Sequence, residues 1–520
     1  MPPTTLNSEE PHIRLYSACC PSWRRAEMVE MPIITHTDTL RILMTKHLGW
    51  IAPSSVFSKL FSGFLTGPVP VLDDRGAKSS GADTSSEQRL LPARRTWVSA
   101  LLIWAAACVF HLAIFLVAHE QHKNNHLVGA SRRGDLLGFL SKWDADLYER
   151  IYTNWYPQHL PMRPDGTVDN NTWAFMPLQP LIAGGVADTF GIGYRVAALA
   201  LTIVAGFTLA YVLHRLFIGC LNWRDRGIFD TRALVGDESR NRLALWAVAV
   251  YAFSMASPVF ITGYAEALSV LLIALSVWCV LRGRYLMLLP VALLAALSRP
   301  VGVPLGAFVG LWWLWCTVND YRRRRIEDAS HSALSDAWGS FRGRFGQLIS
   351  ALFVCFFAFV HPLHAALRTG RMDAYFATEL GWSNRKPGEG HQFFIQWILR
   401  IYYYLGGVLP KIVVAIIVIM AVVGFYYWIS RKFSRSLIHP ALWLWTGCYM
   451  GYLFIFWLPI SSTIRILLPL FPLALLVSAY LPKSRWYRPV LVALGMALSI
   501  PWILILWGDQ IMAGIIVLVP

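Results

Sequence analysis

Charged residues are scarce in this sequence. Only 15% of its 520 residues are Asp, Glu, Lys or Arg, whereas 56% are hydrophobic. Soluble globular domains carry about 25% charged residues, so an ordinary soluble domain is excluded. The apolar residues form blocks of about 15–25, the length of a helix that spans a bilayer, and such unbroken runs favour helices over barrel strands. The sequence therefore predicts an all-α, polytopic membrane protein with about eleven transmembrane helices.

Cysteine is also sparse. The eight cysteines are scattered, mostly within apolar runs, with no CxxC pair and no Cys/His spacing of a zinc site. We expect neither a bound metal nor a disulfide framework. A repeat of fixed period is absent too, which removes one argument for an inverted-repeat transporter.

Acidic residues are outnumbered by basic ones, 30 to 46, and the formal net charge is +16. A nucleic-acid-binding protein could carry this charge. Here, however, the basic residues cluster in short loops between apolar runs, as in Arg282-Gly283-Arg284 and Arg322–Arg325. This is the distribution described by the positive-inside rule. We therefore interpret the charge as a signal of membrane orientation and expect no nucleic-acid partner.

The N-terminal part lacks strong apolar runs. Residues 1–95 mix Pro, Ser, Thr, Gly and charge, which predicts a mostly disordered cytoplasmic extension without a signal peptide. Residues 96–520 form the predicted membrane domain. Loop charges place external loops at 119–173 and 368–400. The expected spans are 97–118, 194–218, 243–261, 267–281, 285–297, 304–318, 348–367, 407–429, 439–458, 464–481 and 487–507.

The Pro-rich segment 174–190 needs a separate interpretation. Arginines in the loop 224–242 favour the inside, so only one crossing fits between that loop and the first external loop. We expect 174–190 to lie half-buried at the outer face. In the alternative, this segment crosses and the arginine loop lies outside.

Polar residues that could carry chemistry are few. Carboxylates can take a proton from a hydroxyl, and arginine can hold a phosphate with two hydrogen bonds. Each also has a structural alternative, such as helix capping, a helix-dipole contact or snorkelling to the headgroups. Those that the topology places at the outer face are Asp144, Asp146, Tyr148, Glu266, Arg299, Asp373, Glu379, His391 and Arg465.

Asp144 and Asp146 are not expected to act as a pair. In a helix, residues two apart point about 200° from each other, whereas Asp144 and Tyr148 share a face.

Five motifs in order, WDADLY, WAFMPLQPL, GYAEALSVLLIAL, ALSRPVG and IRILLPLFPL, resemble the GPI mannosyltransferase II (PIG-V-like) family. The segment DAYFATELGW at 373–382 also resembles a loop found in its bacterial members. That family belongs to the GT-C glycosyltransferases, which use polyprenyl-phosphate sugars. The similarity extends from Trp97 to Leu481. It implies a GT-C-like fold.

The resemblance also implies roles for individual residues. Asp144 falls on the position of the catalytic base, and Asp146 on a less restricted neighbouring position. Where the family has a Gly-Tyr pair, this chain has Trp155-Tyr156. Where the family usually has an aromatic residue, this chain has Gln179. Both departures concern the acceptor side. The residues implied to contact substrates are Trp143, Tyr148, Gln179, Glu266, Arg299 and Arg465.

The implied reaction is an inverting transfer of a hexose, with mannose expected, from a polyprenyl-phosphate donor to an extracytoplasmic glycan or glycolipid. No cofactor is implied, and the partners are membrane lipid, donor and acceptor. The protein would lie in the plasma membrane of a bacterium or the endoplasmic reticulum of a eukaryote. Two alternatives stay open: a transporter or flippase of a lipid-linked sugar, and a GT-C-like protein that has lost catalysis.

Overall fold

The computed structural model describes residues 96–124, 134–221, 237–327, 332–382, 393–404, 410–432, 439–457, 459, 462–479 and 484–507. Within these residues all regular secondary structure is helical, apart from one isolated β-bridge between Met162 and Val168. The all-α class expected from the sequence is therefore confirmed for this part of the chain. In chain order the elements are α3 (Thr96–Asn124), α4 (Leu136–Leu140), α5 (Asp144–Asn154), η2 (Thr172–Ala174), α6 (Leu178–Phe190), α7 (Tyr194–Leu221), α8 (Asp237–Ala252), η4 (Ser257–Ile261), α9 (Glu266–Leu281), α10 (Tyr285–Ser298), α11 (Gly302–Glu327), α12 (Ala333–Gly343), α13 (Phe345–Phe357), α14 (Val360–Thr369), α15 (Ala374–Trp382), α16 (Ile395–Tyr404), α17 (Lys411–Lys432), α18 (Pro440–Phe456), α19 (Thr463–Ile466), η5 (Leu468–Leu470), α20 (Pro472–Ala479) and α21 (Tyr487–Leu506).

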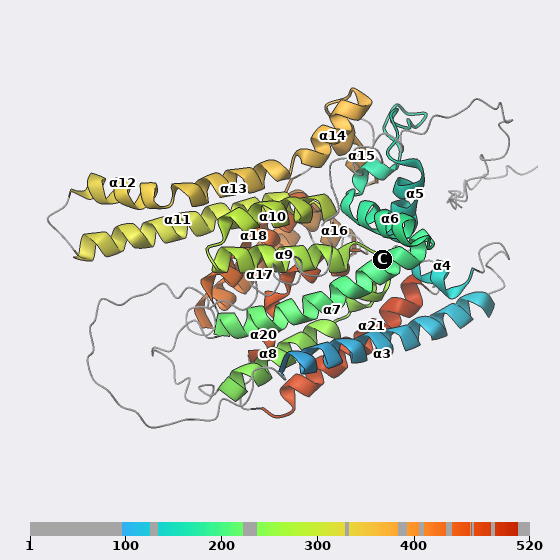
Figure 1. Ribbon diagram of the computed structural model, residues 1–520, viewed down its shortest axis with the longest axis horizontal. Helices are drawn as coiled ribbons and strands as arrows, with labels where there is room; N and C mark the ends of the chain where they lie inside the picture. Colours follow the sequence, from blue (N-terminus) through green and yellow to red (C-terminus); the bar gives the residue numbers. More distant parts are fainter. Residues whose placement is uncertain are drawn as a thin grey trace, which may run out of the picture. The chain divides into compact units, whose positions relative to one another are not determined.

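The long helices lie side by side, and several short helices gather at one end of them (Figure 1). Helix α9 packs against α7 and α10, and α11 packs against α13 and α18. At the right-hand end of the view lie α4, α5, α6, α14 and α15, while α12 lies at the left-hand end. The described helices of the two expected external loops, 119–173 and 368–400, thus lie at the same end.

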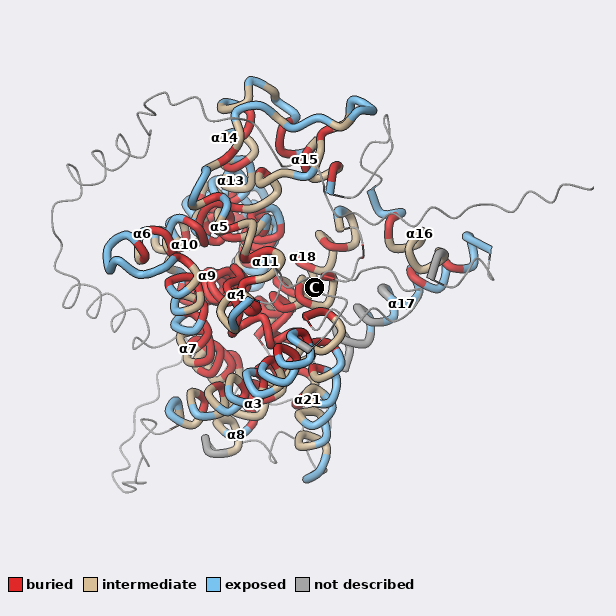
Figure 2. Tube along the Cα trace, turned by 90° about the vertical axis from the view of Figure 1, so that its right-hand side faces the viewer, coloured by how far each residue is buried: buried red, intermediate tan, exposed pale blue. Residues whose placement is uncertain are grey.

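Helix α9 lies within this bundle and is covered on all sides. Every residue from Glu266 to Val280 is buried, as expected for a helix that is apolar all round. Figure 2 shows buried residues around α7 and α9 and exposed faces on α3 and α21. On α3, Leu102 is 65% exposed and Val109 is 69% exposed.

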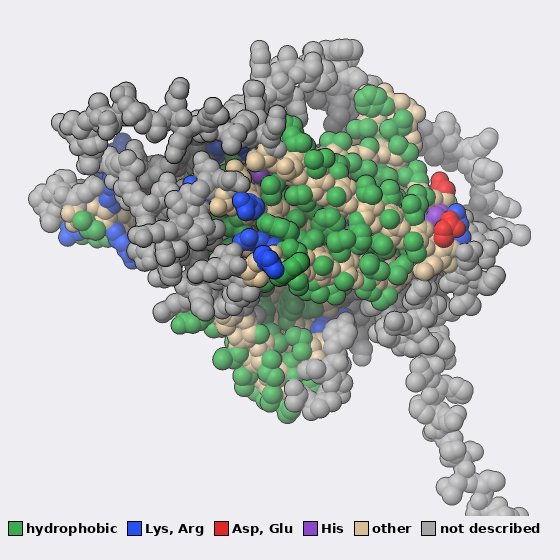
Figure 3. Space-filling view, turned by 90° about the horizontal axis from the view of Figure 1, so that it is seen from below, with side chains coloured by type: hydrophobic (Ala, Val, Ile, Leu, Met, Phe, Trp, Pro, Cys, Tyr) green, Lys and Arg blue, Asp and Glu red, His purple; other side chains and the backbone are tan. Residues whose placement is uncertain are grey.

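A broad apolar surface covers one side of the molecule. In Figure 3 it lies between Lys and Arg side chains toward the left and a group with Asp and Glu side chains at the right. A soluble monomer rarely exposes so continuous an apolar surface. Three described helices, α3, α7 and α21, are long and apolar enough to cross a membrane, and the bent pair α13–α14 would make a fourth. The chain is therefore a membrane protein with several spans, and the number eleven stays a prediction.

Two of the expected spans are broken. The span expected at 243–261 is helical only to Ala252 and resumes as the 3-10 turn η4, which has Pro258 in its first turn. The span expected at 464–481 is divided into α19, η5 and α20, with Pro469 and Pro472 at the breaks. Proline lacks the backbone N–H that a continuous helix needs, and its ring clashes with the preceding turn. As continuous helices, these two expectations are wrong.

A third span is bent. Helices α13 and α14 meet at an angle of 40°. At this bend Gly302 lies against Ala358 so closely that an added Cβ would be 2.7 Å from the Cα of Ala358. The start of α11 is thereby held against the break in the expected span 348–367.

The segment 174–190 forms a separate helix, α6. It has 13 residues and ends at Gly191, which adopts a left-handed conformation with φ 64°. A helix of this size is about 20 Å long, shorter than the roughly 30 Å of a bilayer's hydrocarbon core. Its length thus agrees with a helix that does not cross alone. The expected disordered extension, residues 1–95, and His391, one of the polar residues expected at the outer face, lie outside the described residues.

Candidate functional site

Helix α5, which carries the WDAD motif, begins at an unusual backbone position. Asp135 caps the preceding α4 by accepting a hydrogen bond from the Gly138 amide at 2.9 Å. Trp143 then has φ 62° and ψ −119°, and Asp144 starts the helix. A bulky residue at positive φ costs about 1–3 kcal/mol, and such strain persists only where surrounding packing enforces it. The start of α5 is therefore fixed by tertiary contacts rather than by local preference.

Four charged side chains from distant parts of the sequence meet at this point. Arg465 Nη1 donates to Asp144 Oδ2 at 2.7 Å and to Glu266 Oε1 at 3.0 Å. Arg299 Nη2 donates to the same Oδ2 at 3.3 Å and also to Glu266 Oε1. We call Asp144, Glu266, Arg299 and Arg465 the ion cluster. It joins the starts of α5 and α9, the connection between α10 and α11, and α19.

Local sequence explains why each member lies at a helix end. Glu266 is the first residue of α9, where a carboxylate is favoured by the positive end of the helix dipole. Arg299 precedes Pro300, and a residue before proline disfavours the helical conformation, so α10 ends at Ser298. Arg465 lies in the one-turn helix α19, which the prolines of the broken span keep short.

The ion cluster is buried and electrically balanced. The exposed fractions of its side chains are 8% for Asp144, 5% for Glu266, 16% for Arg299 and 7% for Arg465. Two carboxylates face two guanidinium groups, so the formal charge is zero. Removing charges from water is costly, and only mutual pairing makes such burial tolerable. The four groups therefore depend on one another.

Pairing within the ion cluster is incomplete. The Nε atoms of Arg299 and Arg465 and Oε2 of Glu266 are buried without a hydrogen-bond partner. Both hydrogen bonds that Arg299 and Arg465 donate to Asp144 end on its Oδ2 atom. A site made only to tie helices together would satisfy the unpaired atoms, because each unpaired buried group costs about 1–3 kcal/mol. The unpaired donors can bind an anion, and a carboxylate oxygen can accept a proton.

Burial raises the pKa of the Asp144 carboxyl, but Arg465 and Arg299 lower it more, and the net pKa lies below its ordinary value. Asp144 is therefore ionised at neutral pH.

Two tyrosines border the ion cluster. The guanidinium of Arg465 lies over the Tyr264 ring, 5.1 Å from its centroid, which is a cation–π geometry. Tyr148 is one turn after Asp144 on α5 and only 1% exposed, and its ring meets Phe175 edge-on at 5.7 Å. The expectation that Asp144 and Tyr148 share a helix face is confirmed.

Asp146 is not part of the ion cluster. Its carboxylate faces solvent and pairs with Arg150 at 2.8 Å and with Arg195 at 4.0 Å. The predicted divergence of Asp144 and Asp146 is confirmed, because the segment is helical. Of the two aspartates proposed as catalytic, only Asp144 contacts Arg299 and Arg465.

The remaining predicted substrate contacts are not joined to the ion cluster by hydrogen bonds. Gln179, in the first turn of α6, is completely buried, and both polar atoms of its amide lack a partner. The indole Nε1 of Trp143 is buried without a partner as well. Asp373 is exposed and paired with Arg371 at 2.8 Å.

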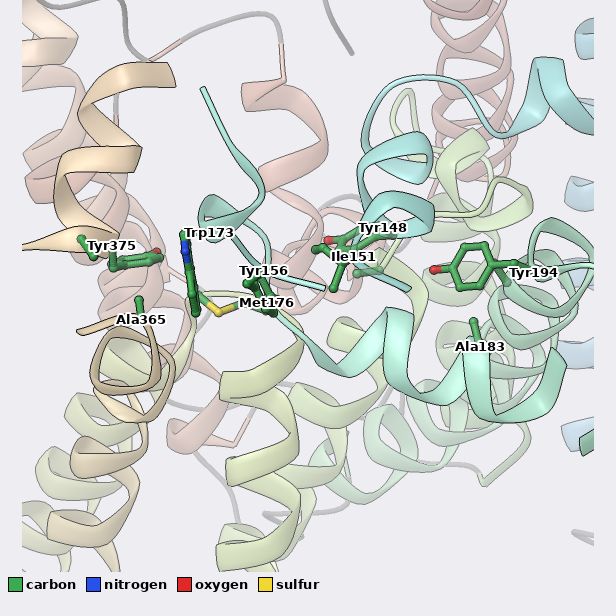
Figure 4. Close-up of a cluster of buried hydrophobic side chains, with 12 residues drawn as sticks. Tyr148, Ile151, Tyr156, Trp173, Met176, Ala183, Tyr194, Ala365 and Tyr375 are labelled. Carbon is green, nitrogen blue, oxygen red and sulfur yellow. The ribbon is translucent and has the colours of Figure 1, made fainter. Parts of the chain in front are cut away.

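An aromatic core joins the expected external loop 119–173 to helices α14 and α15 (Figure 4). Tyr156 stacks on Trp173 with ring centroids 4.3 Å apart, and its hydroxyl donates to the carbonyl of Phe175 at 2.7 Å. His361 of α14 contacts the carbonyl oxygen of Trp173 at 2.9 Å. Tyr156 is 1% exposed, so its side chain is part of this core, and the acceptor-side position that the resemblance implied stays a prediction.

Sequence reasoning gave Glu379 no role, although it placed this residue outside. Glu379 is half-buried on α15 and accepts a hydrogen bond from Tyr375, one turn earlier. Burial raises the pKa of Glu379 and outweighs the lowering effects of the Tyr375 hydrogen bond and the charge of Arg299, so the net pKa is about 7. Tyr375 and Glu379 are four residues apart on one helix, and this spacing is the sequence signal from which their contact could have been predicted.

Within the residues that the structure describes, no three His, Cys, Asp or Glu side chains are grouped to hold a metal ion. Chemistry without a metal stays a prediction. Comparisons with protein-family models, with curated proteins and with solved structures find no match to this chain. The resemblance of the five motifs likewise stays a prediction.

Proposed function

We propose that this protein is a membrane glycosyltransferase of GT-C type, with about eleven spans, that uses a polyprenyl-phosphate hexose as donor. The acceptor would be an extracytoplasmic glycan or glycolipid, and mannose is the expected sugar. The observation that supports this proposal is the contact of one carboxylate, Asp144, with two arginines at the end of the bundle that carries α5 and α15, helices of the two loops expected to be external.

Arginine suits the donor's phosphate. A guanidinium binds phosphate oxygens through paired, charge-assisted hydrogen bonds, and it stays charged in a low-dielectric site. The unpaired Nε atoms of Arg299 and Arg465 are donors that a phosphate oxygen can accept from. The polyprenyl tail would lie along the apolar helices, which accounts for a catalyst embedded in the membrane.

Asp144 suits the role of base. In the reaction, the acceptor hydroxyl oxygen forms a bond to the anomeric carbon as the bond from that carbon to the phosphate oxygen breaks. The hydroxyl proton goes to Asp144, and polyprenyl phosphate leaves with one more negative charge than the donor had. One negative charge is therefore lost at Asp144 as another appears on the phosphate, and both groups face the same arginines.

This exchange explains the arrangement energetically. Arg299 and Arg465 can move hydrogen bonds from Asp144 to the leaving phosphate without changing the total charge of the buried site. Donors already placed where charge develops stabilise a transition state more than they stabilise the ground state. As the arginines move to the phosphate, the pKa of Asp144 rises, and the carboxylate becomes a stronger base when its proton is needed.

A transporter or flippase of a lipid-linked sugar is the main competing function. Such proteins more often place their polar groups at broken helices near the middle of the membrane. Here three of the four members of the ion cluster, Asp144, Glu266 and Arg299, lie at the starts of α5 and α9 and the end of α10, and only Arg465 lies in a broken span.

The two functions differ in what accumulates when the protein is missing. Mass analysis of envelope glycolipids from cells with and without the protein distinguishes them. A truncated glycan, restored by the wild-type chain and not by Asp144→Asn, is the expected result. Accumulation of a complete lipid-linked sugar would favour the flippase instead.

A further inference from the structure

The opposite end of α9 carries a second buried arginine. Arg282 is the residue after the helix, whose 16 residues place it about 24 Å from Glu266 and the ion cluster. Arg282 is 9% exposed, and its guanidinium lies over the Trp278 ring, 4.9 Å from the centroid. In the topology predicted from the loop charges, this end faces the cytoplasm.

The charge of Arg282 is not balanced as the ion cluster is. Its Nε and Nη1 atoms are buried without a hydrogen-bond partner. Burial and the nearby charges of Arg284 and Arg215 all lower the pKa of Arg282, and among the described residues no acidic side chain opposes them. Arginine nevertheless stays protonated at neutral pH. Two other arginines thus lie near the unpaired Nε and Nη1 donors of Arg282.

An anchoring role at the membrane surface does not account for this geometry. An arginine that snorkels keeps its charged head in water and buries only its stem. Arg282 instead buries two of its donor nitrogens, and an unpaired buried charge is costly. An anion between the three arginines would remove that cost.

The surroundings favour an anion that comes with an apolar tail. Leu286, at the start of α10 and two residues after Arg284, is 85% exposed. We expect this exposed apolar side chain to contact lipid when the protein is in a membrane. A phosphate held by the arginines would therefore have acyl chains beside it.

We propose that Arg282, Arg284 and Arg215 bind a phosphate group, supplied by the headgroup of an anionic phospholipid of the inner leaflet. Free inorganic phosphate offers the same chemistry, so the experiment must separate the two. This site lies at the other end of the bundle from the ion cluster and stands apart from the proposed transfer reaction.

Native mass spectrometry of the full, delipidated chain tests this proposal. The probes are phosphatidylglycerol, phosphatidylcholine with the same acyl chains, and inorganic phosphate. We expect tighter binding of phosphatidylglycerol than of phosphatidylcholine, and a loss of about tenfold or more in Arg282→Gln and in Arg215→Gln, because each removes a charge-assisted hydrogen bond. The matched control is Arg322→Gln, an exposed arginine at the same predicted face, which should change the affinity less than about twofold.

Each outcome decides the matter. If Arg282→Gln fails to fold, Arg215→Gln, which alters a half-buried side chain on α7, carries the test alone. Binding of inorganic phosphate that needs Arg282, without a preference for phosphatidylglycerol, would overturn the lipid assignment. Unchanged affinity for phosphatidylglycerol in both variants would overturn the site itself.

Discussion

Replacing Asp144 with Asn removes one negative charge from the ion cluster and leaves its shape almost unchanged. Two guanidinium groups then face a single carboxylate in a buried site. Removing one partner of a buried pair typically costs about 3–5 kcal/mol. The Asn oxygen can still accept from Arg299 and Arg465, so we expect a loss near the lower end, about 3 kcal/mol.

The same variant should bind the donor at least as well as the wild type does. In the wild type, Asp144 competes with the donor's phosphate for the arginines, and its removal leaves a net positive charge. Transfer should nevertheless fall by about 10²–10⁴-fold, since general base catalysis contributes about that much. The opposite charge change, Arg465→Gln, should weaken donor binding and transfer together, because ground state and transition state both carry the phosphate charge.

Asp146→Asn is the matched control. It lies two residues away on the same helix, and its carboxylate makes exposed ion pairs that are worth about 0–1 kcal/mol. Thermal unfolding, donor binding and single-turnover transfer would be measured for the purified variants in lipid nanodiscs. An inactive Asp146→Asn beside an active Asp144→Asn would refute the assignment of the base. Donor binding that is lost in Asp144→Asn would refute the competition for the arginines.

Three further predictions concern other parts of the chain. Because Glu379 binds its proton more tightly in the folded state than in the unfolded state, the unfolding free energy should fall by about 2–3 kcal/mol as pH rises from about 4.5 to 7. Glu379→Gln should remove that slope in thermal unfolding, and an unchanged slope would contradict it. Gly306→Val should destabilise the protein by about 1–3 kcal/mol, because a Cβ there would lie 2.9 Å from the Cα of Cys355 on α13. Gly310→Val should be tolerated, because a Cβ at Gly310 would have no atom within 4 Å. Equal melting temperatures of the two variants would contradict this packing. An impermeant thiol reagent added outside should label a cysteine placed at Gln158 and spare one at Arg322, and the reverse pattern would invert the topology.

The sequence was most informative where one physical constraint dominates. Apolar run length predicted α3, α7, α9 and α21 well, because a bilayer demands helices of fixed length. It failed where prolines interrupt an apolar run, since hydropathy does not register the missing N–H, as in the span expected at 464–481.

The candidate site, too, could be predicted from the sequence only in part. Helical geometry was enough to separate Asp144 from Asp146. The contact of Asp144 with Arg465 joins residues 321 positions apart. No local pattern encodes that contact, which depends on how the helix ends pack together. The unpaired amide of Gln179 has no explanation in this structure.

The most direct test of the proposed function follows the sugar itself. Membranes that contain the wild-type protein, Asp144→Asn or Asp146→Asn would receive polyprenyl-phosphate mannose labelled in the sugar, and the label would be followed from donor to acceptor. We predict transfer that depends on the protein, persists in Asp146→Asn and is lost in Asp144→Asn. Transfer that is equal in all three membranes, or absent from all of them, would contradict a glycosyltransferase that uses this donor and Asp144 as its base.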